Sequence, residues 1–576
     1  IKVELKGRRQ FYVHGLLISS SNNTIRGLAL YNWDRQIVID DSKGRNNHIE
    51  GNFIGTNAAQ TFKSSNMDTH HSEGLRMMQK ASYNVVGCGS FTPDNQFVPC
   101  TDRAMINAAR NIVIGNGDDG IHLQGNVFYN RIVGNYIGLR QDGETCEFKA
   151  DWLTNRDNCG NGRDAVDFEL GPQYNWLGGE TPAERNVISG NGSDGIEISH
   201  ARTTQYNRVV GNYFGLNAAG TRAVRNINNG ISYEDTVNKN MSYNNVVSGN
   251  ASNGLRFYNS ASENEYRNNI VGFGADGVTE IPNGVLNPLL PSREQKGDNG
   301  VLIMGGSHHN LIVGNHIANH PGHGIYLTNS PTTGTENRDK LKTAYNTISQ
   351  NSISNNGGKG IHWSGTGTSS ANRGLQAPVL DAQKATTRSV SGTACANCVI
   401  EVFVADKTKL GGADDAGEGK TFIGSGTADS SGVFTVQTTE TTPGTILTAT
   451  ATDPDGNTSQ FSKNVAVTID IGATETVVAA TAQAQASATA SAVQATANAE
   501  ATIVAATANA QATIGALTAV AQTATAQVAG TQTAIVLETS PSLAQTATSV
   551  AQTATAQVTP APFEPKYQVL LPMISR

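Results

Sequence analysis

Short apolar segments recur along the first 375 residues, and each follows a polar turn that ends in glycine. The aligned strings are GNGDDGIHL (115–123), GNGSDGIEI (190–198), NINNGISY (226–233), GNASNGLRF (249–257), GDNGVLIM (297–304), NHPGHGIYL (319–327) and NNGGKGIHW (355–363). The intervals between their glycines are mostly near multiples of about 24 residues. A polar turn followed by an apolar-x-apolar triplet predicts many short strands joined by tight turns.

A second recurring string accompanies the first, as in YNRIVGNYIG (129–138) and YNRVVGNYFG (206–215). One such coil has too little apolar surface to fold alone. Coils stacked at about 4.8 Å pair every strand in parallel and enclose a continuous apolar interior. We therefore predict a parallel β-helix over residues 1–375. Asn in the GN dipeptides suits the left-handed turn conformation and can bond to the Asn of the next coil.

These strings resemble the right-handed parallel β-helix repeat proteins of the pectin-lyase-like superfamily, particularly large secreted bacterial surface proteins with NxIxGNxIG coils. The resemblance covers roughly residues 1 to 375 and implies a mainly β, right-handed parallel β-helix. This architecture carries lyases, hydrolases, adhesins and inert stalks, so the resemblance does not select an activity.

Residues 376–471 alternate apolar and polar positions between turn signals, which predicts a β-sandwich of about seven short strands. The string TATATDPDGNTS (448–459) resembles the last hairpin of bacterial immunoglobulin-like (Ig-like) domains. Asp453 and Asp455 are candidate calcium ligands, although we favour a plain type I turn at this position. We expect no other cofactor.

The composition changes at residue 472, where an Ala/Thr-rich tail begins. From Ala473 to Val558 the only charged residues are Glu475, Glu500 and Glu538. Three interpretations compete: a disordered stalk with O-glycosylated Thr, a β-strand, and a long helix. We favour the helix, because Ala has the highest helix propensity and the repeat ATANAEATIVA/ATANAQATIGA (495–516) spaces eleven residues over about three turns.

A long, nearly uncharged helix needs a neighbour, so we expect residues 472–560 to be an assembly element. Its large apolar residues Ile503, Ile514, Leu517 and Val520 are the predicted contacts to another copy of the chain. Residues 561–576 form a Pro-rich linker and a strand-like segment with Tyr567, Val569, Leu570 and Leu571. That segment is either an export or anchoring signal or a strand added to a sheet of another subunit.

The cysteines and the charge restrict the setting. The six cysteines form three local pairs, which we predict to be disulfides: Cys88–Cys100, Cys146–Cys159 and Cys395–Cys398. Disulfides indicate an extracellular or cell-surface protein, although the sequence shows no signal peptide. A redox or zinc motif is the less favoured alternative for CANC (395–398).

The formal net charge is −7, and Lys and Arg are scattered, so we expect no nucleic-acid partner. No run of 18 apolar residues occurs, so we also expect no transmembrane helix. The remaining partners to consider are copies of the chain and cell-wall or matrix polysaccharide.

A paired aspartate, Asp118–Asp119, and a Gly-His-Gly around His323 resemble the catalytic strings of polygalacturonases. Those enzymes carry the two strings on neighbouring coils. Here Asp119 and His323 occupy the same slot before the turn glycine, and 204 residues separate them, or roughly eight or nine coils and 40 Å. Catalytic carboxyls must lie within about 10 Å of each other, so we predict that these residues do not form one site.

Lyase chemistry needs a basic residue near carboxylates or calcium, and RDAVDFELG (163–171) offers Asp164, Asp167 and Glu169. We favour the simpler interpretation of a strand with carboxylates on its solvent face. The His-containing strings DTHHSEG (68–74) and SHH (307–309) similarly favour surface loops over metal sites.

The sequence therefore offers no convergent catalytic group. Our leading prediction is a secreted, non-enzymatic structural protein that self-assembles through its tail into a surface layer or filament. The alternative is a polysaccharide-acting enzyme or glycan-binding protein tethered by a stalk.

Overall fold

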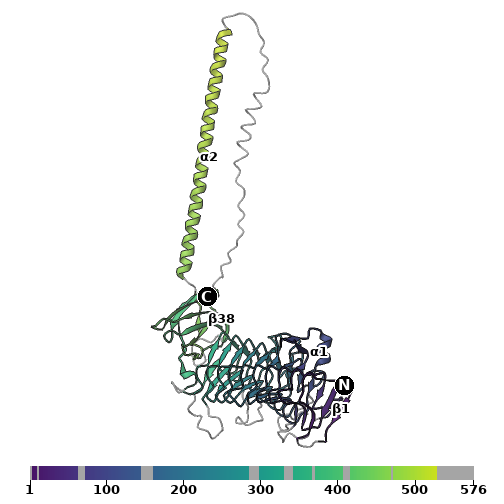
Figure 1. Ribbon diagram of the computed structural model, residues 1–576. Coiled ribbons are helices and arrows are strands. Elements are labelled where there is room, and N and C mark those ends of the chain that lie inside the picture. The colour runs from purple at the N-terminus through teal and green to yellow at the C-terminus, as the bar shows by residue number, and fades with distance from the viewer. Residues whose placement is uncertain are drawn as a thin grey trace, which may run out of the picture. The chain divides into compact units, whose positions relative to one another are not determined.

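The computed structural model consists of a parallel β-helix, a smaller pair of antiparallel sheets and a long helix (Figure 1). It describes residues 3–8, 12–62, 72–144, 160–284, 298–329, 342–365, 367, 370–406, 416–468 and 471–528. Residues 1–471 form one compact unit and residues 472–576 a second.

Three parallel sheets form the β-helix, and each coil contributes one strand to each sheet, except that the last described coil, with β33 and β34, has none in sheet C. Sheet A consists of β1 (Val3–Lys6), β4 (Leu28–Tyr31), β7 (Phe53–Ile54), β12 (Ile112–Val113), β15 (Tyr136–Ile137), β18 (Val187–Ile188), β21 (Tyr213–Phe214), β24 (Val246–Val247), β27 (Ile270–Val271), β30 (His316–Ala318) and β33 (Ser352–Ser354). Sheet B consists of β2 (His14–Ile18), β5 (Arg35–Ile39), β8 (Glu73–Met77), β13 (Ile121–Gln124), β16 (Val166–Glu169), β19 (Ile196–Ser199), β22 (Ile231–Tyr233), β25 (Leu255–Phe257), β28 (Val301–Met304), β31 (Ile325–Thr328) and β34 (Ile361–Trp363). Sheet C consists of β3 (Thr24–Arg26), β6 (His48–Glu50), β9 (Val85–Gly87), β14 (Arg131–Val133), β17 (Trp176–Gly178), β20 (Arg208–Val210), β23 (Met241–Tyr243), β26 (Glu265–Arg267), β29 (Leu311–Val313) and β32 (Thr347–Ser349).

The interior of the coils is a continuous column of aliphatic and aromatic side chains. In sheet B, Ile121, Val166 and Ile196 pair in register and are fully buried. The residue directly after each of them in its strand points outward, because successive side chains of a strand alternate between its two faces. The apolar-x-apolar triplets in the sequence are therefore inward-outward-inward, and only the middle residue is available for chemistry.

Ladders of buried asparagines join the coils at their turns, as the sequence predicted. In one ladder, Asn135 donates its backbone N–H and its Nδ2 to Oδ1 of Asn186, at 2.9 and 3.1 Å. One detail of the prediction was wrong. In the GN dipeptides the glycine adopts the left-handed conformation, with φ of 74° at Gly134 and 67° at Gly211, and the asparagine that follows forms the ladder.

A hairpin and a short helix project from the early coils. The hairpin pairs β10 (Gly89–Phe91) with β11 (Phe97–Pro99), and the disulfide Cys88–Cys100 closes it. Helix α1 (Arg103–Ala109) follows, capped by the side chain of Asp102. A second predicted disulfide, Cys395–Cys398, is also present, whereas Cys146 and Cys159 lie outside the described residues.

Beyond a 3-10 turn at Ala371–Gly374, two antiparallel sheets follow, as predicted. One consists of β35 (Val379–Ala385), β36 (Ser389–Thr393) and β39 (Val433–Gln437); the other consists of β38 (Gly419–Thr427), β37 (Val399–Ala405), β40 (Ile446–Thr452) and β41 (Val465–Ala466). The two sheets share a core that includes Val390, Val402 and Val436. The Ig-like relationship of this module stays a prediction.

The antiparallel module covers the last coil of the β-helix. Phe403 and Phe461 of the module belong to the same apolar cluster as the β-helix interior. The side chain of Glu401 accepts hydrogen bonds from Ser349 and Gln350 of the β-helix. The C-terminal end of the coil stack is therefore closed by protein.

Helix α2 (Ile471–Val528) confirms the predicted helical tail over its described part. Every side chain described between residues 481 and 520 is exposed, and the hydroxyls of Thr and Ser along it donate to the carbonyl four residues earlier, as Thr502 does to Asn498. The segment Thr481–Val520 is long and apolar enough to cross a membrane by length and composition alone, with a mean hydropathy of 1.4. The expectation of no such helix, drawn from uninterrupted apolar runs, missed this segment because Thr and Gln interrupt its alanines.

Candidate functional site

The outward face of sheet B carries a line of ionisable residues over consecutive strands. Strand pairing places Arg76, His122, Asp167 and Glu197 side by side at equivalent positions of β8, β13, β16 and β19. The line continues through Ser232 of β22 to Arg256 of β25. We call these six residues the central row. It spans five strand steps, or roughly 24 Å at the usual strand spacing.

His122 lies at the centre of a ring of carboxylates. Its Nδ1 is 3.1 Å from Glu73 Oε1, and its Nε2 is 3.1 Å from Glu169 Oε2. Asp119 and Asp167 lie slightly farther away, at 3.7 and 3.6 Å. Burial lowers the pKa of His122, but the charge of Asp167 and the hydrogen bonds with Glu169 and Glu73 outweigh it and raise this pKa well above its ordinary value. The imidazole is therefore a cation at neutral pH.

Two of the carboxylates around His122 are firmly ionised. Burial raises the pKa of Glu73, but the hydrogen bond and charge of His122, with Arg76 and Arg35, lower it to about 2. The hydrogen bond from His122 and a second from Gln124 lower the pKa of Glu169 to about 2. Of the two, the Glu169 side chain is the more accessible, with 21% of its surface exposed.

An acidic ladder lies beside the central row, at the turns that precede the strands of sheet B. Asp164 donates its backbone N–H to Asp119 Oδ1 at 3.0 Å, and Asp194 donates to Asp164 Oδ1 at 2.7 Å. In later coils the same slot holds Asn229, Asn253 and Asn299. We call Asp119, Asp164 and Asp194 the acidic ladder. All three are buried.

Glu197 lies between the acidic ladder and the solvent. It makes no hydrogen bond or ion pair to any residue in the part of the chain that the structure describes, and its surface is partly exposed. Burial, followed by the charges of Asp164, Glu234, Asp167 and Asp194, raises the pKa of Glu197 to about 11. At neutral pH this side chain is a neutral carboxylic acid that a ligand on the sheet can reach.

The far end of the central row is held by a guanidinium. Arg256 forms an ion pair with Glu234, and its Nε donates to Ser232 Oγ at 3.1 Å. Its Nη2 also lies 3.8 Å from Asp194 Oδ2. Arg256 therefore offsets part of the negative charge beside Glu197.

Within the described part of the chain, two groups of ligand atoms are close enough together to bind a cation. One consists of Asp119, His122 and Asp167, and the other of Asp164, Asp194 and Glu197; the atoms of each lie within 4.8 Å of one another. In the first group His122 is protonated, which removes its capacity to act as a ligand. The all-oxygen donors of the second group suit a hard cation such as calcium.

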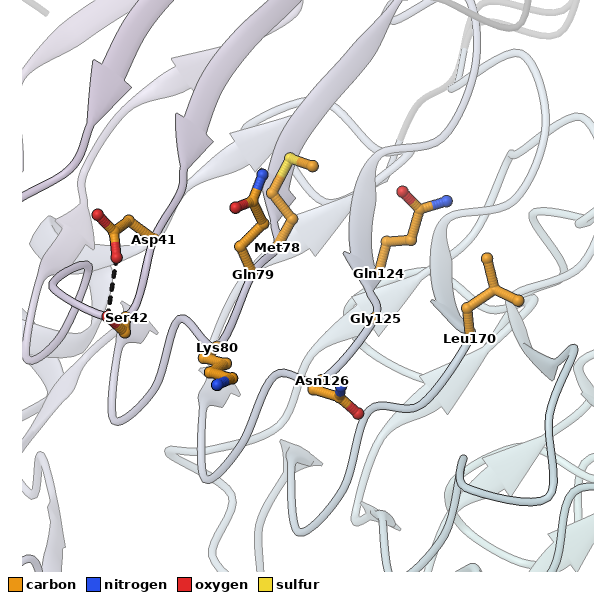
Figure 2. Close-up of a pocket in the computed structure, with 9 residues that line it drawn as sticks. All are labelled: Asp41, Ser42, Met78, Gln79, Lys80, Gln124, Gly125, Asn126 and Leu170. Atoms are coloured by element: carbon orange, nitrogen blue, oxygen red, sulfur yellow. Dashed lines mark hydrogen bonds between the residues drawn. The ribbon is translucent and has the colours of Figure 1, made fainter.

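A shallow pocket of about 570 Å³ adjoins the central row at the turns that follow β5, β8, β13 and β16. Figure 2 shows its lining from successive turns: Asp41, Ser42, Met78, Gln79, Lys80, Gln124, Gly125, Asn126 and Leu170. Gln124 connects the pocket to the row, because its amide donates to Glu169 and accepts from Arg76. The pocket can hold part of a ligand whose remainder lies across the row.

A serine relay next to the site is not accessible. Ser199 Oγ lies 2.6 Å from His200 Nδ1, and His200 Nε2 lies 3.3 Å from Asp235 Oδ2. Ser199 has no exposed surface, so no ester can reach its hydroxyl. Nucleophilic serine chemistry is therefore not supported here.

The structure confirms that Asp119 and His323 do not share a site, but the separation between them is shorter than predicted. They precede β13 and β31, which are six steps apart in the order β13-β16-β19-β22-β25-β28-β31, or roughly 29 Å. The prediction of eight or nine coils was wrong because loops lengthen several coils. His323 is a ladder rung whose N–H donates to Asn299 Oδ1 at 2.9 Å.

Several residues that the sequence analysis placed at the surface are buried in the structure. Asp167 lies on the outward face of β16, as predicted, but is only 8% exposed, and Asp164 is a buried ladder residue that is 1% exposed. Glu73, in a string interpreted as a surface loop, is a buried strand residue bonded to His122. The structure thus brings Glu73, His122 and Glu169 together, which the sequence analysis did not anticipate, and Glu197 was not singled out at all.

The remaining predicted site residues lie elsewhere. Asp453 accepts hydrogen bonds from the backbone and side chain of Asn457, as in a plain turn, and Asp455 pairs with Arg373. In the SHH string, His308 and His309 contact each other at 2.8 Å. The assembly residues Ile503, Ile514, Leu517 and Val520 are exposed, whereas Tyr567, Val569, Leu570 and Leu571 lie outside the described residues.

Comparisons with known proteins address the fold. The family model described as right handed beta helix region matches residues 222–373. Similar solved structures include the periplasmic alginate epimerase AlgG (10% identity over 60% of this chain and 75% of that chain, TM-score 0.32), pectate lyase Pel9A (12%, 52% and 76%, TM-score 0.22) and the Dettilon tailspike protein (13%, 78% and 84%, TM-score 0.25). No curated protein sequence matches the chain. The family model and the three parallel sheets together identify this chain as a protein with a right-handed parallel β-helix.

Proposed function

We propose that this protein is a polysaccharide-acting enzyme and that its active site is the central row of sheet B. The observation that carries the proposal is Glu197, a partly exposed carboxyl whose pKa is raised to about 11 among buried carboxylates. A carboxylic acid that stays protonated at neutral pH is the form required of a general acid. A folded protein gains no stability from holding such a group, so its presence favours catalysis over a purely structural role.

Glu169 is the matching base. It is ionised and partly exposed, and it lies on the outward face of β16. Glu197 pairs across the strands with Asp167, so Glu169 is its diagonal neighbour. Two strand positions along and one strand across correspond to roughly 8 Å between the α-carbons of the two residues. Inverting glycoside hydrolases hold their acid and base carboxyls about 6.5 to 9.5 Å apart, which leaves room for a water molecule.

The substrate class follows from shape and charge. The central row runs along the coil axis across six consecutive strands, and Glu197 and Arg256 are its partly exposed members, so it suits an extended polymer better than a small molecule. The ionised carboxylates Glu73, Glu169 and Glu234 are balanced by Arg76, His122 and Arg256, so the site has no excess positive charge to attract a polyanion. We therefore propose hydrolysis of a neutral polysaccharide, with the pocket at Gln124 accepting one sugar unit or branch.

The test is a screen of neutral and acidic polysaccharides with the purified chain. New reducing ends without ultraviolet absorbance of unsaturated sugars are expected for hydrolysis, and NMR of the first product should show inversion at the anomeric carbon. Glu197→Gln and Glu169→Gln should each lower kcat by at least about 100-fold. Unsaturated products would instead show elimination, and a blank screen would remove the proposal.

Glu265→Gln is the matched control. Glu265 lies on sheet C beside Arg267, away from the central row, so its removal should leave the cleavage rate unchanged. Thermal unfolding should show that all three variants are folded. Equal losses in all three would indicate general damage and would contradict the assignment of Glu197.

We further propose that helix α2 associates with α2 of another copy, which keeps part of the assembly prediction. The support is the exposure of its large apolar residues, with Ile503 54% and Ile514 63% exposed. Light scattering should show an oligomer that Ile503→Glu/Ile514→Glu dissociates. A wild-type monomer that floats with lipid vesicles would point to membrane insertion instead and would overturn this second proposal.

A further inference from the structure

Each residue of the acidic ladder differs from a ladder asparagine at one side-chain atom, an oxygen (Oδ2) in place of the amide nitrogen (Nδ2). Asn253 donates both its N–H and its Nδ2 to Asn229 Oδ1, at 3.2 and 3.0 Å. Asn229 makes the same pair of bonds to Asp194 Oδ1. Asp194 repeats the backbone bond, at 2.7 Å to Asp164 Oδ1, but carries an oxygen where an asparagine carries its NH₂ donor. Without that donor, the side-chain oxygens of Asp194 and Asp164 are both acceptors, and no hydrogen bond joins them unless one is protonated.

The structure shows the consequence at Asp194. Its Oδ2 is buried and, among the described residues, has no hydrogen-bond partner. The nearest cation is Arg256, whose Nη2 is 3.8 Å away and which also pairs with Glu234. A buried carboxylate oxygen that accepts no hydrogen bond is costly, whereas a protonated one donates a hydrogen bond as an amide does.

We propose that Asp194 is protonated on Oδ2 in the resting protein and donates this proton to Asp164, and that the pair keeps Glu197 in its acid form. Asp164 and Asp194 are then positioning residues for Glu197. The proton arrangement follows from the ladder geometry, while its catalytic use rests on the proposed function.

Proximity explains how the pair acts on Glu197. The carboxyl oxygens of Asp164, Asp194 and Glu197 lie within 4.8 Å of one another. The pair already holds one negative charge, so ionising Glu197 would place a second charge beside it. Burial and the neighbouring charges raise the pKa of Asp194 to about 8, which supports the same assignment.

Charged groups on every packed element affect this balance. The preceding turn contributes Asp118 and Asp119, β16 contributes Asp167, and β22 is followed by Glu234. The cations are Arg163 and Arg256. Arg163 pairs with Asp118 at 3.6 Å, and Arg256 pairs with Glu234 while its Nη2 lies 3.8 Å from Asp194 Oδ2, so Arg256 is shared between Glu234 and Asp194.

Asp194→Asn tests the proton directly. The asparagine restores the donor without a titrating group, so the excess of its melting temperature over that of the wild type should be small at pH 5 and larger at pH 9. This measurement needs no substrate. A variant that melts below the wild type at both pH values would overturn the inference, whatever the enzyme activity.

Asn253→Asp is the matched control, because it makes the reverse exchange higher in the same ladder. It should lower the melting temperature at pH 9 and recover at pH 5, where the new aspartate can be protonated. A loss of equal size at both pH values would show that protonated Asp cannot replace Asn here, which contradicts the proposed bond.

Asp164→Asn tests the effect on Glu197. It removes the shared negative charge and keeps the ladder bonds, so the alkaline limb of the pH–rate profile should move to lower pH by at least one unit. An unmoved limb in an active variant would overturn the positioning role. If no polysaccharide is cleaved at all, the proposed function fails, while the melting data still decide the shared proton.

A calcium titration tests whether a metal ion, rather than a proton, lies between the carboxyl oxygens of Asp164 and Asp194. We expect neither calcium nor EDTA to change the melting temperature of the wild type. A calcium-dependent rise that disappears in Asp194→Asn would mean that a cation, rather than a proton, joins Asp164 and Asp194, and it would overturn the inference.

Discussion

At the scale of single residues, the fold is specified by what each turn position must satisfy. A ladder asparagine supplies an acceptor to the coil on one side and donors to the coil on the other, and successive strand residues alternate between core and solvent. Replacing Asn by Asp keeps the acceptor and removes the donor. The site is built from this small chemical difference, repeated at Asp119, Asp164 and Asp194.

A buried rung should be costly to remove. Asn186 is fully buried; it accepts from Asn135 and donates to Asn212 and to the Ile132 carbonyl. Asn186→Ala leaves these groups unpaired and should lower the free energy of unfolding by about 2 to 4 kcal/mol. Urea unfolding followed by circular dichroism measures the change, and a loss below about 1 kcal/mol would contradict the role of the ladder.

The raised carboxyl pKa values predict the pH dependence of stability. Asp167 and Asp194 titrate near pH 8 and Glu197 near pH 11 in the folded chain, against 3.8 and 4.5 for exposed Asp and Glu. Above about pH 4.5 the unfolded chain releases protons that the folded chain retains, so stability falls as pH rises. Glu73 and Glu169, lowered to about 2, stabilise the fold above pH 4.5 and lose that contribution in acid.

Stability should therefore be highest near pH 5 and decline towards pH 8. Guanidinium unfolding at a series of pH values tests this expectation. A free energy of unfolding that increases between pH 5 and pH 8 would show that these carboxyls are ionised in the folded chain.

At the scale of elements, the sequence predicted the strands well and the site poorly. Triplets such as GIHL and GIEI identified β13 and β19, because alternation is a local signal. The coil of β16 was not aligned as a repeat, since Ala165 takes the slot that glycine fills elsewhere. The convergence of Glu73, His122 and Glu169 depends on the stacking order of coils of unequal length, which no local pattern contains.

The hairpin disulfide should contribute measurably to stability. Cys88 and Cys100 are 12 residues apart, so their bond restricts a loop for which chain entropy predicts about 3 kcal/mol. Cys88→Ser/Cys100→Ser should lose about that amount. Cys395→Ser/Cys398→Ser, with a separation of 3 residues, is the control and should lose less. The reverse order in thermal melts would contradict the loop-closure explanation.

At the scale of the whole molecule, the antiparallel module completes the β-helix. The sequence predicted both parts but not their shared core, because Phe403 and Phe461 look like ordinary strand and loop residues in the module. Capping hides the end of the parallel sheets, which would otherwise offer unpaired strands. A strand from another subunit, one of the two roles predicted for residues 561–576, therefore finds no free sheet at this end of the coil stack.

A substitution in the shared core should destabilise the β-helix and the antiparallel module together. Phe461 is 6% exposed and packs edge-on against Phe403 at 5.6 Å. Phe461→Ala should cost about 3 to 5 kcal/mol. Val433→Ala, at a strand position that is 51% exposed, should cost little. Two separate transitions in the Phe461→Ala variant, with the β-helix unaffected, would contradict a shared core.

The ladder also has an evolutionary consequence. Each rung contacts only the coil before it and the coil after it, so exchanging Asn for Asp changes the local charge without altering the path of the chain. A mutation of a single base converts an asparagine codon into an aspartate codon. An ionisable site can therefore move one coil at a time along such a scaffold, and its position along the axis can diverge faster than the fold that carries it.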